Sequence, residues 1–402
     1  MLGRLDELIR RTPAGRDRYM DFLRALSILV VVVGHWLIGM IYWRGGVIGT
    51  RSAIGVTNWA WAFTWLLQVM PIFFFVGGFS NFVTYRSSQR SGTSTWRWTR
   101  TRLTRLFAPS LIFIGVWVLI QVGLHLSDVG AKTTPFLRGV RPPGATVPFG
   151  PLWFLGLYAV VLVVAPVMIR LHERFGLAVP AGMVLGAVTM DALGFVAGLK
   201  GFRYLNVVFV MFLPHQLGFF YADGRLRRLP RSAHATMALS GLALLVLLTN
   251  PWIFGEVGER WFPGVGHYPK SLLGTDVEPI SNAYPPTICF MAMAFWSIGV
   301  VMLLRERVSR WLERDGPWRF TVLVNSVIMT LFLWHMTAYL IAILLLWPLG
   351  LGHTNATQLR WWLERPIWIL VPGAILLVIV AVFGRFERPA ALRKVPVRAG
   401  GP

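Results

Sequence analysis

Ten long apolar runs constrain the fold of this chain more than any other feature of its sequence. They cover residues 20–42, 58–82, 106–126, 151–171, 177–199, 203–222, 234–254, 284–304, 320–347 and 366–384. A run of about 20 apolar residues is the length that crosses the hydrocarbon core of a bilayer as a helix. Helices and closed barrels alone satisfy their backbone hydrogen bonds there. The sequence therefore predicts an all-α polytopic membrane protein with about ten transmembrane helices.

The basic residues predict the orientation of these helices. Of the 39 Lys and Arg residues, 27 lie at the two termini and in alternate connections, 11 lie in the connections between those, and Arg24 lies inside the first run. Basic residues accumulate on the cytoplasmic side of membrane proteins. We therefore expect an even number of spans and both termini in the cytoplasm. The basic residues of these connections account for the net charge of +22, so we expect the bilayer, and not nucleic acid, as the partner.

The connections between the runs do not have the pattern of a second folded domain. We expect residues 1–388 to form a single transmembrane domain and residues 389–402 to form a basic, disordered cytoplasmic tail. Cys289 is the single cysteine, which excludes an internal disulfide and a cysteine-based metal site. The histidines do not have metal-ligand spacing, so no metal is expected.

Arg24 and His35 are the most informative polar residues within the runs, where charged and titratable groups are expensive and therefore candidates for function. A separation of eleven residues places them within about 20° on one helix face and about 16 Å apart along the axis. A snorkelling arginine and a hydrogen-bonded core histidine are the alternative. Asp191, His215 and His335 occupy later runs. Together these side chains predict a hydrated or ligand-filled central cavity.

A group of arginines precedes the third run on the predicted cytoplasmic side. Arg102 and Arg105 are three residues apart and share a helix face, and Arg97 precedes them. Planar guanidinium groups suit phosphate, although anchoring of the helix end is the alternative. In the second run, Gly77 and Gly78 favour close helix packing over space for a narrow ligand.

Several of these segments resemble the integral-membrane acyltransferase 3 family. Residues 21–35 resemble its opening helix, whose signature is Arg or Lys, ten residues and then His. Residues 73–79, FFFVGGF, are similar to its FFxxSGF element, and the later elements resemble residues 102–109, 151–155 and 333–335. The resemblance covers about the whole chain. One departure is Gly77, where many members have Ser.

The resemblance implies an O-acyltransferase that moves an acetyl (acyl) group from cytoplasmic acyl-CoA to a hydroxyl of a carbohydrate-containing envelope molecule. The site residues that it implies are His35 with Arg24 for catalysis, Arg97, Arg102 and Arg105 for the phosphates of acetyl-CoA, and Trp153 and His335 for the acceptor substrate. The 35 Arg against 4 Lys suggest a high-GC bacterium, for which a mycolate glycolipid is one acceptor among several. The expected location is then the bacterial inner (plasma) membrane.

Two other readings remain open at this stage. A proton-coupled transporter or lipid flippase would use buried His, Asp and Arg side chains as relays. An inactive acyltransferase-like scaffold is the third reading, because Gly77 departs from the family pattern.

Overall fold

The protein is a multi-pass membrane protein whose computed structural model describes residues 15–44, 47–126, 148–275 and 280–387. Ten helices of the described residues are long and apolar enough to span a membrane, which confirms the predicted number and the all-helical class. The predicted tail, residues 389–402, lies outside the described residues.

The long helices are α2 (Arg18–Ile38), α4 (Met70–Arg90), α5 (Thr95–Leu126), α8 (Leu152–Phe175), α9 (Ala178–Phe195), α10 (Asn206–Ala222), α11 (Arg231–Thr249), α13 (Ile288–Trp311), α15 (Ile328–Leu346) and α17 (Arg365–Phe383). The short elements are strands β1 (Gly39–Arg44) and β2 (Val47–Ser52), helices α3 (Trp61–Leu67), α12 (Pro251–Trp261), α14 (Asp315–Asn325) and α16 (Leu359–Leu363), and the 3₁₀ turns η1 (Ala53–Gly55), η2 (Lys200–Leu205), η3 (Leu226–Arg228) and η4 (Trp347–Leu349).

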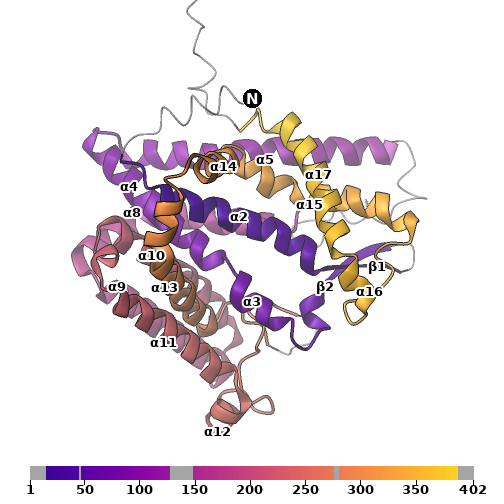
Figure 1. The fold of residues 1–402 in the computed structure, drawn as a ribbon. Helices are drawn as coiled ribbons and strands as arrows, with labels where there is room; N and C mark the ends of the chain where they lie inside the picture. The colour runs from indigo at the N-terminus through magenta and orange to yellow at the C-terminus, as the bar shows by residue number, and fades with distance from the viewer. Residues whose placement is uncertain (1–14, 45–46, 127–147, 276–279, 388–402) are drawn as a thin grey trace, which may run out of the picture.

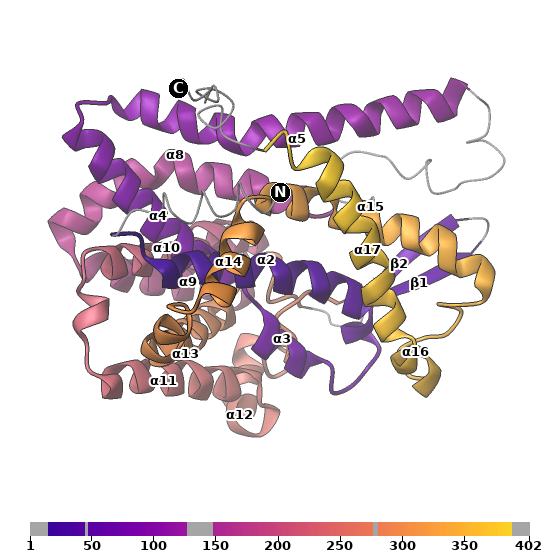
Figure 2. The ribbon, with the colours of Figure 1, turned by 45° about the horizontal axis from the view of Figure 1, so that its top comes forward.

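Helix α2 runs through the middle of the bundle, whereas α5 runs along one edge (Figures 1 and 2). Five helices pack against α2: α4, α13, α14, α15 and α17. The helix begins at Asp17, whose carboxylate accepts a hydrogen bond from the backbone N–H of Met20 at 3.1 Å. Such a cap satisfies one of the otherwise free N–H groups of the first turn. The central position gives α2 the protein environment that its polar residues require.

The first predicted span ends earlier than expected. The run was predicted to be helical to residue 42, but α2 ends at Ile38 and the chain continues as β1, which pairs antiparallel with β2 from Gly39 opposite Ser52. Gly39 has an extended backbone, φ −68° and ψ 118°. Glycine is a poor helix former, and the Ile, Tyr and Trp that follow it favour strands. The all-helical bundle therefore carries one small hairpin at this end.

Two predicted spans are divided. In the second, α3 ends at Leu67 and α4 restarts at Met70, because Pro71 has no N–H to continue the ladder onto the Leu67 carbonyl. In the ninth, α14 and α15 are separated at residues 326–327. The Glu387 carboxylate caps α15 by accepting hydrogen bonds from the backbone N–H of Met329 at 2.7 Å and of Thr330 at 2.8 Å. Burial raises the pKa of this carboxyl.

Glycines set the spacing between α4 and α10. A Cβ on Gly78 would lie 2.0 Å from the His215 carbonyl oxygen, and a Cβ on Gly218 would lie 2.2 Å from the Phe75 carbonyl oxygen. Neither backbone oxygen can move away without displacing its helix. Close packing, the favoured reading of Gly78 from the sequence, is therefore what the structure has at this position.

Candidate active site

His35 and His335 form a contact between α2 and α15. The Nε2 atom of His335 lies 3.3 Å from Nδ1 of His35, and the ring centroids are 5.1 Å apart. His335 is fully buried. His35 is surrounded by protein atoms, yet its side chain has exposed surface. The pair therefore has an inner member, His335, and a member that an entering molecule can reach, His35.

The hydrogen bonds of the pair assign its protons. Nδ1 of His335 lies 2.6 Å from the Phe332 carbonyl oxygen, and Nδ1 of His35 lies 2.8 Å from the Val31 carbonyl oxygen. A carbonyl oxygen only accepts, so both Nδ1 atoms carry hydrogen when the rings are neutral. Nε2 of His335 then presents its lone pair to the His35 Nδ1–H. Nε2 of His35 keeps a free lone pair, and no described residue forms a hydrogen bond with it.

The position of His35 is fixed by contacts at the end of α2. The Trp36 indole donates to the His335 backbone oxygen at 3.1 Å and ties α2 to α15. Tyr339 and Arg365 donate to the Gly39 carbonyl oxygen at 3.0 and 3.1 Å. His35 lies in the last turn of α2, where the helix dipole favours a positive charge. An imidazolium formed at His35 is therefore stabilised by the helix end and by the lone pair of His335.

Arg24 lies at the other end of the same helix face. Its guanidinium is 3.8 Å from the Asp21 carboxylate. Asp21 also accepts a hydrogen bond from Arg16. Asp21 therefore interacts with two arginines, Arg16 and Arg24, and neutralises Arg24 only in part.

Arg102 and Arg105 join Arg24 in one basic cluster. The guanidinium groups of Arg24 and Arg105 both lie close enough to that of Arg102 for their charges to interact with it. Arg102 donates to Ser80 Oγ at 3.0 Å and to Asn81 Oδ1 at 2.8 Å, so α4 orients it. The positive charges of Arg24 and Arg105 each act on Arg102, and a nearby anion would offset their repulsion. The cluster therefore has the electrostatic character of a site for phosphate groups.

The structure does not bring Arg97 and Trp153 into these two groups of residues. Arg97 is exposed, and five residues along α5 correspond to a rotation of about 140° away from Arg102. Trp153 is 53% exposed near the start of α8. Its neighbour Phe154 instead packs towards the histidine pair, with its ring 5.9 Å from that of Phe332.

Other polar residues predicted within the spans have structural partners. Asp191 is fully buried and accepts hydrogen bonds from Asn206 at 2.6 Å and from the Tyr268 hydroxyl at 2.9 Å. His215 is paired with Asn81 at 3.1 Å. Tyr268 lies outside the spans, and burial raises the pKa of its hydroxyl. These contacts satisfy Asp191 and pair His215 within the bundle, whereas His35 of the His35–His335 pair keeps exposed surface.

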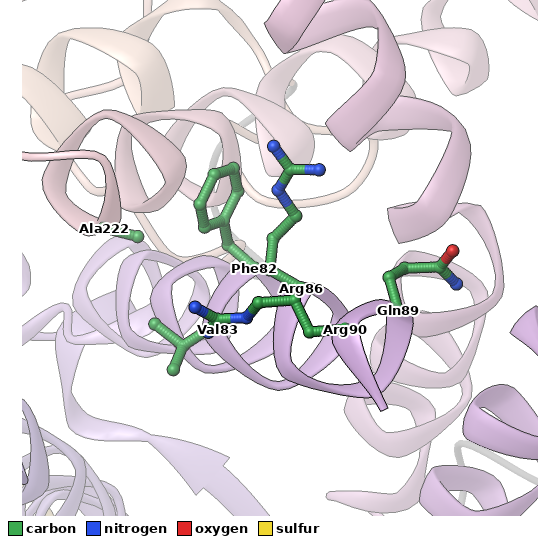
Figure 3. A pocket seen from close by; sticks show the side chains of 6 residues that line it. All are labelled: Phe82, Val83, Arg86, Gln89, Arg90 and Ala222. Carbon is green, nitrogen blue, oxygen red and sulfur yellow. The ribbon is translucent and has the colours of Figure 1, made fainter. Parts of the chain in front are cut away.

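A cavity of about 630 Å³ lies where α4 and α10 end (Figure 3). Its lining residues are Phe82, Val83, Arg86, Gln89, Arg90 and Ala222. None of the predicted site residues lines it. In the part of the chain that the structure describes, no group of three or more His, Cys, Asp or Glu side chains is placed to hold a metal ion.

Comparison with known proteins identifies a family. A family model described as an acyltransferase domain matches residues 17–385, nearly the whole chain. Neither a curated protein nor a solved structure shows significant similarity to the chain.

Proposed function

The chain belongs to the acyltransferase 3 family, and we propose that it transfers an acetyl (acyl) group from cytoplasmic acyl-CoA to a hydroxyl of a carbohydrate-containing envelope acceptor. The observation that carries this proposal is the arrangement along α2. A histidine with a free Nε2 lone pair lies at one end of a helix face, and a cluster of three arginines lies at the other. The family match to an acyltransferase favours this reading over a proton-coupled transporter or lipid flippase.

The basic cluster would bind the donor. In our proposal Arg24, Arg102 and Arg105 hold the phosphates of acetyl-CoA, each through charge-assisted hydrogen bonds. From Arg24 to His35 the helix rises about 16 Å, a length that the extended acyl-pantetheine arm can bridge. The donor would therefore present its thioester beside His35 while its phosphates stay at the basic end. Arg97 remains a prediction for this site, as a more peripheral contact.

His35 would perform the chemistry. Its Nε2 removes the proton from the acceptor hydroxyl as the oxygen attacks the thioester carbonyl. The tetrahedral intermediate then expels the CoA thiolate, which accepts that proton from Nε2 and leaves as the thiol. Throughout, the Nδ1–H of His35 stays directed at the Val31 carbonyl and at Nε2 of His335. Direct attack by Nε2 to form an acetyl-histidine is the alternative and uses the same lone pair.

His335 fits the role of an orienting partner better than that of a substrate contact, because it is fully buried on the other side of the His35 ring. Trp153 stays the predicted acceptor contact. Its exposed ring at the start of α8 suits stacking on a sugar at the predicted outer face.

The test is purified protein in lipid nanodiscs, supplied with acetyl-CoA and an extract of envelope glycolipids. Released CoA thiol and acetylated lipid are measured together. We expect His35→Gln to lose a factor of about 10² to 10⁴ in transfer while remaining folded. His353→Gln, an exposed histidine elsewhere in the chain, is the matched control. Transfer by His35→Gln at the wild-type rate would refute the proposal, as would substrate uptake without CoA consumption by the wild-type protein in proteoliposomes.

The acceptor and the orientation need their own measurements. Mass spectrometry of envelope glycolipids from a deletion strain should show the loss of acetyl esters, with mycolate glycolipids as the first class to examine. The buried Cys289 gives a low background for cysteine labelling. With both termini in the cytoplasm, Trp252→Cys, 95% exposed in α12, should react with an impermeant maleimide in intact cells. Labelling only after lysis would show that the orientation is the opposite of the predicted one.

A further inference from the structure

Tyr158 occupies the space beside Gly77. A Cβ added to Gly77 would lie 2.9 Å from Cε2 of Tyr158 and 3.3 Å from its hydroxyl oxygen. The phenol ring is held edge-on to Phe73, with ring centroids 5.5 Å apart. Residue 77 thus has no side chain of its own, and a hydroxyl from α8 lies where the side chain of residue 77 would be.

The Tyr158 hydroxyl is available to a ligand. Within the described residues it forms no hydrogen bond, and the side chain is only half-buried. A phenol hydroxyl at this depth normally has a partner. Its oxygen is not fully enclosed by protein atoms. The hydroxyl therefore borders space that a water or a substrate group can enter.

Tyr158 lies between the two parts of the proposed site. Its phenol lies close enough to the Arg102 guanidinium to interact with it electrostatically. One turn along the same face of α8, Phe154 packs on Phe332, whose ring is 6.2 Å from that of His335. A molecule that extends from the basic cluster to the histidine pair would pass this face of α8.

We propose that Tyr158 is a donor-binding residue whose hydroxyl donates a hydrogen bond to a carbonyl of the acyl-pantetheine arm, from the position that a hydroxyl side chain at residue 77 would otherwise supply. This inference rests on the proposed acyl-CoA function. It also accounts for Gly77: a serine there would collide with the Tyr158 ring, and the tyrosine hydroxyl takes the place of the serine hydroxyl.

The primary test is Tyr158→Phe in the full-length protein in nanodiscs, because this change removes only the hydroxyl. Binding is measured for acetyl-CoA and for adenosine 3′,5′-bisphosphate, which lacks the arm. Loss of one hydrogen bond should weaken acetyl-CoA binding about two- to tenfold. Binding of the bisphosphate should be unchanged. Equal affinity of the variant and the wild type for acetyl-CoA, or equal weakening for both ligands, would overturn the proposal.

A swap tests the shared position. Tyr158→Leu opens the space above Gly77, and Gly77→Ser on that background returns a hydroxyl from α4. We expect this double variant to bind acetyl-CoA more tightly than the matched Tyr158→Leu, Gly77→Ala variant. If serine is no better than alanine, residue 77 and Tyr158 do not share a role and this part of the proposal is wrong. A wild-type protein that does not bind acetyl-CoA would instead refute the proposed function itself.

Discussion

Replacing His335 by phenylalanine tests whether this residue acts through His35. The ring volume is kept, and the Trp36 hydrogen bond to the backbone oxygen of residue 335 is unaffected. What His35 loses is the Nε2 lone pair, 3.3 Å from its Nδ1; the local hydrogen bond from His335 Nδ1 to the Phe332 carbonyl oxygen is lost as well. We expect a lower kcat and an unchanged KM for the acceptor, because the lost contact matters most when His35 is an imidazolium.

The expected size follows from the geometry. A hydrogen bond to a charged group contributes about 1.5–3 kcal/mol. The His35 Nδ1–H is shared with the Val31 carbonyl oxygen at 2.8 Å, which is the shorter contact, so the lower half of that range applies. A loss of about 1.5–2 kcal/mol in the transition state is a fall in kcat of about 10- to 30-fold. His335→Gln keeps an accepting oxygen and should lie between the wild type and His335→Phe.

The assay is steady-state CoA release with a double-variant cycle. Because His335 works through His35, adding His335→Phe to His35→Gln should cause little further loss. Thermal unfolding of each variant shows that the fold is intact. A rise in the acceptor KM with unchanged kcat, or a further 10- to 30-fold loss on the His35→Gln background, would show that His335 contacts the acceptor directly.

Three further outcomes are expected. Arg105→Ala should raise the KM for acetyl-CoA by about 5- to 150-fold, because about 1–3 kcal/mol of phosphate binding is lost. Arg100→Ala, a change at an exposed residue of the same helix, should leave this KM unchanged. Equal effects of the two variants would show that Arg105 only anchors the helix end. Gly78→Ala should lower the free energy of unfolding by about 1–3 kcal/mol or more through overpacking, while Gly182→Ala, which meets nothing within 4 Å, should raise it slightly; a similar unfolding temperature for both would contradict the close contact. Glu387→Ala should cost about 1–2 kcal/mol by uncapping α15, and an unchanged unfolding temperature would show that the cap contributes nothing.

The number and class of helices could be predicted from the sequence because the bilayer imposes one length and one polarity on every span. The places where prediction failed are those where local chemistry overrides hydropathy. Residues 39–42 are as apolar as the helix before them, but Gly39 is a poor helix former and β2 provides hydrogen-bond partners for an extended strand. The break before Met70 depends on Pro71, a signal that the sequence does contain.

The candidate site could be predicted only in part. Helical periodicity places Arg24 and His35 on one face, and the structure has the two residues in the environments described above. Helical periodicity cannot predict that His335, three hundred positions later, contacts His35, because that contact depends on how α2 and α15 pack. Periodicity does separate Arg97 from Arg102, since a rotation of about 140° divides them. The sequence alone gave no reason to connect Gly77 with Tyr158.

The partner of His35 is a second histidine rather than a carboxylate, and the cost of burying a charge within a membrane explains this difference. A carboxylate at this depth would carry a charge in every state of the cycle and would cost several kcal/mol to bury. A neutral imidazole provides the same lone pair to the Nδ1–H of His35 without that cost, and the pair becomes charged only while His35 holds a proton. The permanent charge of Arg24 lies about 16 Å along the α2 axis from His35, at the end of the helix where phosphates and water can compensate it. In our proposal, this separation would let one helix face bind a polyanionic donor while His35 stays neutral and able to act as a base.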